Sequence, residues 1–92
     1  MKFVMTYQMT PETRTRAVAR FLEGGAPPPE GVTMLGRWHA AAGLHGYILL
    51  ESEDQTAIYR WSSEWSDLLN FDITPVVEDA EAAAVLQSMQ YV

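Results

Sequence analysis

Cysteine is missing from the chain, and its absence removes several kinds of chemistry at once. Disulfides, thiolate nucleophiles, iron–sulfur clusters and cysteine-ligated zinc sites all need that residue. Histidine is scarce too: His39 and His45 lack the spacing of a His-x-x-x-His or His-Glu-x-x-His zinc motif. We therefore expect no metal and no cofactor. Haem bound through His39 stays open as a further possibility, which a Soret band after haem addition would reveal.

Basic residues and long apolar runs are also few. Six Lys and Arg stand against twelve Asp and Glu, which gives a formal net charge of −6. A negative surface repels phosphate backbones and anionic lipid headgroups. No basic-then-apolar N-terminal run and no long apolar stretch is present, so neither a signal peptide nor a membrane span is predicted. We expect a small acidic cytoplasmic protein that binds neither nucleic acid nor membranes.

What the sequence does contain is enough apolar material for one core. With 92 residues we expect a single domain spanning 1–92, in which hydrophobic residues make up 48% and aromatic residues 11%. A domain of this size buries a modest share of its surface, so its stability is limited unless another chain covers more apolar area. The length alone therefore favours an oligomer.

Periodicity and end signals predict an alternation of strands and helices. Thr10 can cap the first helix and Gly24-Gly25 can end it, while Ser52 with Gln55 three residues later matches a capping box for the second. The Ala42-Gly43 pair predicts a hairpin turn. Asp79 can cap a last helix with an apolar stripe. The expected order is strand 2–9, helix 11–23, strands 32–41 and 44–52, helix 53–69, strand 71–77 and a C-terminal helix.

This order is that of a ferredoxin-like α+β fold, βαββαβ, with an appended C-terminal helix. Pro75 then falls on an edge strand, where proline is tolerated. The two central strands are apolar on both faces, since Val4 and Leu49 alternate with Phe3 and Leu50. Helices can cover one face only. A second subunit is the simplest cover for the other face, so we expect a homodimer of the dimeric α/β-barrel type.

Three stretches of the sequence together form a recognisable pattern: Gly36-Arg37-Trp38-His39, residues 46–51 and residues 61–76. The most specific part is a Trp-x-x-x-Trp-Ser-Asp-Leu run followed by a Thr-Pro-Val strand. With these stretches the chain resembles, nearly end to end, the small bacterial family called domain of unknown function 3303. The resemblance implies a fold similar to dimeric α/β barrels, a group that includes cofactor-free monooxygenases and haem-degrading enzymes. It assigns no activity and no catalytic residue.

Arg37, His39 and Tyr7 are the candidate catalytic residues. If the hairpin loop has two or four residues, Arg37 and His39 share one sheet face with Ile48, and Trp38 shares the other with His45 and Tyr47. Arg37 could then bind an anionic substrate while His39 acts as base or donor. The competing interpretation, which we favour, is a hydrogen-bonded His and a salt-bridged Arg near a dimer interface. His45, after the turn, is expected to be an exposed loop residue.

Aromatic side chains are the candidate ligand-binding residues. Trp61 and Trp65 lie four residues apart, so both rings project from one helix face and could form a wall for a flat ligand. Trp38 is a third candidate. The alternative for this pair, a purely structural core role, is the commoner use of such residues.

Two functional hypotheses follow. In the first, the protein is a homodimeric module that binds a small apolar or aromatic molecule, or a protein partner, because aromatic residues are plentiful and titratable groups few. In the second, it is a cofactor-independent enzyme, monooxygenase- or isomerase-like, with a pocket lined by Arg, His and Tyr. The sequence does not decide whether the protein is an enzyme.

Overall fold

A computed structural model describes residues 1–89 and has the predicted order of elements, βαββαβ with an additional helix. Burial alternates along the two central strands, and each helix begins after a capping residue. No helix within residues 1–89 is long and apolar enough to cross a membrane. The elements are β1 Lys2–Gln8, α1 Pro11–Gly24, β2 Val32–His39, β3 His45–Ser52, α2 Gln55–Trp65, β4 Asn70–Val76 and α3 Asp79–Ser88.

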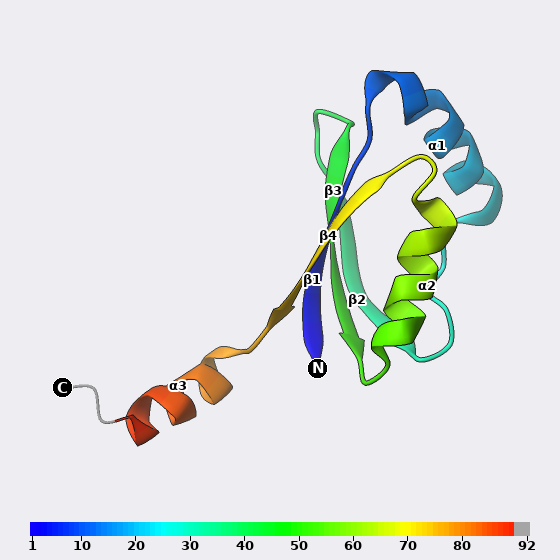
Figure 1. The fold of residues 1–92 in the computed structure, drawn as a ribbon. Helices are drawn as coiled ribbons and strands as arrows, with labels where there is room; N and C mark the ends of the chain where they lie inside the picture. Colours follow the sequence, from blue (N-terminus) through cyan, green and yellow to red (C-terminus); the bar gives the residue numbers. More distant parts are fainter. Residues whose placement is uncertain (90–92) are drawn as a thin grey trace.

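The four strands form one antiparallel sheet in the order β2-β3-β1-β4. β1 and β3 are central, and Pro75 lies on the edge strand β4, as predicted. Helices α1 and α2 cover the same face of the sheet, while α3 extends beyond the end of β4, away from the other elements (Figure 1). The fold is therefore ferredoxin-like α+β, with one face of the sheet left uncovered in the single chain.

The core lies between this sheet and the two helices. Every second residue of the central strands points into it, and Met5 and Leu50 are almost completely buried. Trp61 and Ile58 close the core from α2. The opposite residues of the same strands, including Val4 and Leu49, face outward and are half-buried. Apolar residues on both faces of β1 and β3 were expected, and the register confirms them.

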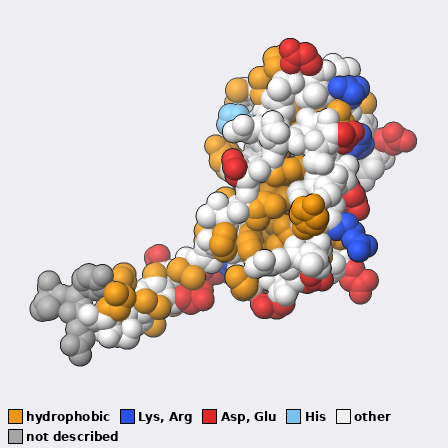
Figure 2. All heavy atoms as spheres, viewed as in Figure 1, with side chains coloured by type: hydrophobic (Ala, Val, Ile, Leu, Met, Phe, Trp, Pro, Cys, Tyr) orange, Lys and Arg blue, Asp and Glu red, His pale blue; other side chains and the backbone are white. Residues whose placement is uncertain are grey.

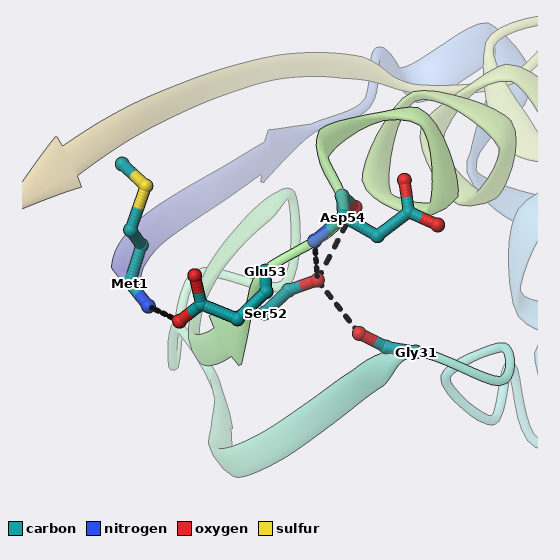
Figure 3. A network of polar contacts seen from close by, with 5 residues as sticks. All are labelled: Met1, Gly31, Ser52, Glu53 and Asp54. Carbon is teal, nitrogen blue, oxygen red and sulfur yellow. Dashed lines mark hydrogen bonds and ion pairs between the residues drawn. The ribbon is translucent and has the colours of Figure 1, made fainter.

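The start of α2 differs from the prediction. Ser52 is the last residue of β3, paired with Val32, and is not the helix cap. Asp54 caps α2 instead, its carboxylate accepting hydrogen bonds from the N–H groups of Thr56 and Ala57. The Ser52 hydroxyl donates to the Gly31 carbonyl oxygen at 2.6 Å and accepts from the Asp54 N–H at 2.9 Å (Figure 3). Ser52 is buried, and its hydroxyl joins the loop before β2 to the start of α2 instead of capping the helix.

Three further predictions need correction. Glu78, and not the predicted Asp79, is the N-cap of α3. The expected helix 53–69 is shorter, because it ends at Trp65 and the chain turns, with the N–H groups of Leu68 and Leu69 both donating to the Trp65 carbonyl. His45 is not a loop residue: it opens β3, pairs with Gln8 and contacts Tyr47 edge to face at 5.8 Å between ring centroids. The first helix ends as predicted, with Gly25 in the left-handed region at φ 76°.

Candidate functional site

A cavity of about 270 Å³ lies between α1, α2 and the helix-covered face of the sheet. Most of the lining is apolar. Its polar residues are Tyr7, Arg14, Arg37 and His39, and the others are Met5, Met9, Ala17, Val18, Phe21, Ala26, Gly43, Ile48, Trp61, Trp65, Leu69 and Phe71.

Tyr7 and His39 form the most specific polar contact of the cavity. The Tyr7 hydroxyl lies 2.6 Å from His39 Nδ1, although the two residues are on strands that do not pair with each other. Gly46 on the intervening β3 pairs with both. A Cβ at Gly46 would lie 2.2 Å from the Tyr7 ring, so the ring occupies the space of the missing side chain. The glycine thus lets the phenol cross β3 and reach the imidazole.

The environment keeps this phenol protonated. Burial raises the pKa of Tyr7 above its ordinary value of 10.0, and the positive charge of Arg37 opposes the change only in part. The phenol and Nδ1 share one hydrogen bond, and the tautomer of the imidazole decides which of the two groups donates it. His39 is itself exposed at the rim, with its ring edge-on to Phe21 at 5.6 Å. With either tautomer the pair leaves one donor and one acceptor for a bound molecule.

Arg37 holds the segment that follows α1. Its guanidinium donates to the carbonyl oxygens of Ala26 at 2.8 Å and Gly25 at 3.0 Å. It also lies over the Phe21 ring, 5.0 Å from the centroid. The predicted salt bridge is absent from these contacts, since both hydrogen-bond acceptors are backbone carbonyls. Because guanidinium carries five N–H donors, the group can hold this loop and still present positive charge to the cavity.

Trp61 and Trp65 both line the cavity, as the helical spacing predicted, whereas Trp38 does not. Trp38 pairs with Tyr47 and lies on the outer face of the sheet, where its ring covers Gly36. Trp65 is contacted from α1 by Arg20, whose guanidinium lies 5.2 Å from the Trp65 ring centroid.

The hairpin loop between β2 and β3 has the even length that places Arg37 and His39 on the inner face of the sheet. The Ala40 N–H still donates a hydrogen bond to the His45 carbonyl oxygen at the end of the hairpin.

Arg20 also joins the two helices. It makes a bidentate ion pair with Asp67, at 3.0 and 2.7 Å, and donates to the Glu64 carbonyl oxygen at 3.1 Å. The hydrogen bond from Arg20 lowers the pKa of Asp67 below its ordinary value, so the pair is ionised at neutral pH. The contact links α1 to the end of α2, the two helices that form walls of the cavity.

Sequence reasoning missed several lining residues. Arg14 precedes Ala17, Val18 and Phe21 by three, four and seven residues, so helical spacing alone places it on the same face of α1. Its side chain lies over the hairpin loop, 3.7 Å from a Cβ built at Gly43. Arg14 is not among the residues predicted to line a site, although its helical spacing is the signal that could have found it.

The charges of the cavity have one sign. No Asp or Glu is among its lining residues, while two arginines are, in a chain whose net charge is −6. No group of three or more His, Cys, Asp or Glu within residues 1–89 could hold a metal ion. Apolar walls around cationic groups and a neutral phenol are suited to a flat molecule that carries one anionic or hydrogen-bonding group.

Comparisons with known proteins identify the family of this chain but do not assign it an activity. A family model described as domain of unknown function 3303 matches residues 1–90. No curated protein matches significantly. Among solved structures, this chain is similar to a Deinococcus radiodurans protein provisionally described as an antibiotic biosynthesis monooxygenase. The identity is 10% and the TM-score 0.48, with 85% of this chain and 94% of the other covered. So distant a likeness carries no functional argument.

Proposed function

Because the chain belongs to the family of domain of unknown function 3303, which comes with no assigned activity, we propose a function from its own cavity. The protein is a homodimeric module that binds one small, mostly apolar or aromatic molecule per chain. The bound molecule lies against Trp61 and Trp65 and directs its single polar group toward Tyr7 and His39. The observation that carries this proposal is the 2.6 Å Tyr7–His39 contact at one side of an otherwise apolar cavity.

The character of the lining supports a small molecule over a protein partner. Small-molecule sites are concave and mainly apolar, with a few polar groups that fix orientation. This cavity has that form, and its volume of about 270 Å³ suits a ligand the size of naphthalene. The arginines and the absence of carboxylates from the lining favour an anionic group, such as a carboxylate or an enolate, over a cationic one.

The dimer part of the proposal has separate support. The outer face of the sheet carries the half-buried Val4 and Leu49 and the exposed Trp38 and Tyr47, and the exposed Leu35 lies at the irregularity of β2 between Met34 and Gly36. Trp38 and Tyr47 are cross-strand neighbours, so they form one continuous apolar surface with Leu49. Exposed surfaces of this kind mark interaction sites. A second copy that packs its own sheet on this surface would cover both faces equally.

Binding can be tested with 1-naphthoate as the probe. We expect it to quench tryptophan fluorescence and to saturate at one molecule per chain, with neutral naphthalene binding at least tenfold more weakly. Trp38→Phe is the matched control: Trp38 is outside the cavity, so that variant should retain the quenching, while Trp61→Phe/Trp65→Phe should lose most of it. Equal binding of both probes, or quenching that disappears with Trp38, would contradict the proposal.

The Tyr7–His39 pair also favours a second candidate, a cofactor-independent enzyme with His39 as general base. In the tautomer whose Nδ1–H donates to the Tyr7 oxygen, Nε2 is free to take up a proton from an acidic C–H or O–H of a bound molecule. The distinction is catalytic turnover. Native mass spectrometry of protein purified gently from cells would identify a retained molecule, and incubation of that molecule with fresh protein in air should leave it unchanged if the first proposal holds.

A further inference from the structure

Two arginines line the cavity, and their contacts differ. Each terminal nitrogen of Arg37 donates to a backbone carbonyl oxygen, that of Ala26 at 2.8 Å and that of Gly25 at 3.0 Å. Within residues 1–89 the hydrogen bonds donated by arginine side chains come from Arg20 and Arg37 alone, and no ion pair involves Arg14. Arg14 is therefore the arginine of the lining whose guanidinium finds no acceptor in this part of the chain.

Arg14 lies at the end of the cavity where the polar groups gather. Tyr7 and His39 both pair with Gly46, so they lie in one row across the sheet, at the hairpin end of β3. A Cβ built at Gly43, in the hairpin loop, would lie 3.7 Å from both Nε and Nη2 of Arg14. Helix α1 begins at this same end of the sheet (Figure 1). A ligand group that is hydrogen-bonded to the Tyr7–His39 pair thus lies at the end of the cavity to which the Arg14 guanidinium belongs.

The rest of the cavity offers a ligand mainly apolar contacts. Hydrophobic side chains fill the hollow between β4 and α2 (Figure 2). Trp61 and Trp65 belong to this wall, and no Asp or Glu is among the lining residues. A molecule with an apolar ring system and one charged group is therefore oriented by the cavity, with the ring toward α2 and the charge toward the hairpin end.

The charge of Arg14 does not serve the helix that carries it. Arg14 is the fourth residue of α1, which begins at Pro11. The aligned peptide dipoles favour negative charge at this end of a helix, so a positive charge here is unfavourable. No ion pair within residues 1–89 compensates for it. An anion bound in the cavity would supply the acceptor that Arg14 lacks.

We propose that Arg14 binds the carboxylate of the ligand, which makes the ligand an aromatic carboxylic acid. A guanidinium donates two parallel N–H hydrogen bonds to the two oxygens of a carboxylate, whereas an enolate offers one charged oxygen. Arg37 is a positioning residue, which holds the segment after α1 through the Gly25 and Ala26 carbonyls. The assignment rests on the small-molecule function proposed above and narrows its ligand from an anion in general to a carboxylate.

Arg14→Gln tests the assignment, with Arg16→Gln as the matched control. Both arginines are exposed on α1 and both substitutions remove one positive charge, but Arg16 is not among the lining residues. In tryptophan-quenching titrations we expect Arg14→Gln to raise the dissociation constant of 1-naphthoate about fivefold or more and to leave that of naphthalene within twofold. Arg16→Gln should leave both constants within twofold. Arg14→Lys, which keeps the charge but not the planar fork, should bind 1-naphthoate with intermediate affinity.

Arg37→Gln distinguishes the two arginines of the lining. It should lower the melting temperature, because the Gly25 and Ala26 carbonyls lose their donors, and it should weaken both probes by the same factor. Arg14→Gln should melt no lower than wild type, since its charge is unfavourable to α1.

The outcomes separate this assignment from the function on which it rests. A preference for 1-naphthoate that survives in Arg14→Gln, or that is lost in Arg37→Gln or Arg16→Gln instead, would overturn the assignment and leave the cavity as the binding site. Full naphthoate affinity in Arg14→Lys would show that charge alone is recognised, which would overturn the carboxylate as the ligand class. Wild-type protein that binds neither probe, or both equally, would overturn the proposed function as well.

Discussion

At the scale of single residues, two glycines of the sheet have opposite tolerances. A Cβ at Gly46 would meet the Tyr7 ring at 2.2 Å and the Trp38 carbonyl oxygen at 2.6 Å, whereas the three atoms nearest to a Cβ at Gly36 all belong to the Trp38 ring. Backbone and a buried ring cannot move aside, but the Trp38 ring is exposed and can rotate away. An alanine at Gly46 therefore meets atoms that cannot move, whereas an alanine at Gly36 meets a ring that can.

We expect Gly46→Ala to lower the free energy of unfolding by about 2–3 kcal/mol, the upper part of the range for overpacking. Gly36→Ala should cost clearly less and mainly change Trp38 fluorescence. Urea denaturation of both variants measures the difference. Because Gly46→Ala also displaces Tyr7 from His39, 1-naphthoate binding should weaken in that variant only. Equal losses of stability would show that Tyr7 is not confined by β3.

The raised pKa of Tyr7 predicts a stability difference in alkali. Burial, opposed in part by Arg37, lifts the folded-state pKa above 10.0, so the neutral phenol stabilises the fold fully below that pH. As pH rises past 10, the unfolded chain ionises first and this contribution is lost. The stability gap between wild type and Tyr7→Phe should therefore be larger at pH 8 than at pH 11. A gap that widens in alkali would mean that the folded state favours the ionised phenol.

At the scale of elements, the second helix begins where the carboxylate of Asp54 replaces the predicted cap at Ser52. The hydrogen bond from the Thr56 hydroxyl, followed by that from the Ala57 N–H, lowers the pKa of Asp54 below its ordinary value of 3.8. A lowered folded-state pKa means that the charged cap stabilises the fold above about pH 4 and that this contribution is lost as pH falls.

We therefore expect Asp54→Ala to be less stable than wild type at pH 7 and the difference to shrink by pH 2. Thermal unfolding at both pH values gives the comparison. Asp54→Asn is the control, because an amide oxygen can still cap the helix and does not titrate. Its melting temperature should fall less than that of Asp54→Ala at pH 7. An unchanged Asp54→Ala difference at pH 2 would show that the charge contributes nothing.

Most elements could be predicted from sequence because strand and helix periodicity is local. The Trp61–Trp65 pair and the shared face of Arg37 and His39 followed from spacing and from an even hairpin length. The Tyr7–His39 contact could not be predicted, since it depends on a glycine of a third strand that lies between them. Ser52 misled the assignment of the cap because a local motif does not show that the residue is still paired in the sheet.

At the scale of the whole molecule, charge and apolar surface act in opposite directions on association. Each chain carries a formal net charge of −6, so two copies repel each other, while the proposed interface joins apolar residues. Salt shortens the range of repulsion between exposed charges and leaves apolar contacts intact. The balance between these two effects can be read from the salt dependence of the dimer.

We expect the dimer to tighten as sodium chloride rises from 10 mM to 150 mM, where the screening length falls to about 8 Å. Sedimentation equilibrium at both concentrations should show a dissociation constant that decreases several-fold. Trp38→Asp adds a charge to the proposed interface itself and should weaken the dimer at both salt concentrations, whereas Tyr59→Asp, on the exposed side of α2, should behave like wild type. If salt weakened the dimer instead, ion pairs would be holding the copies together, and an apolar interface between the outer sheet faces would be the wrong description.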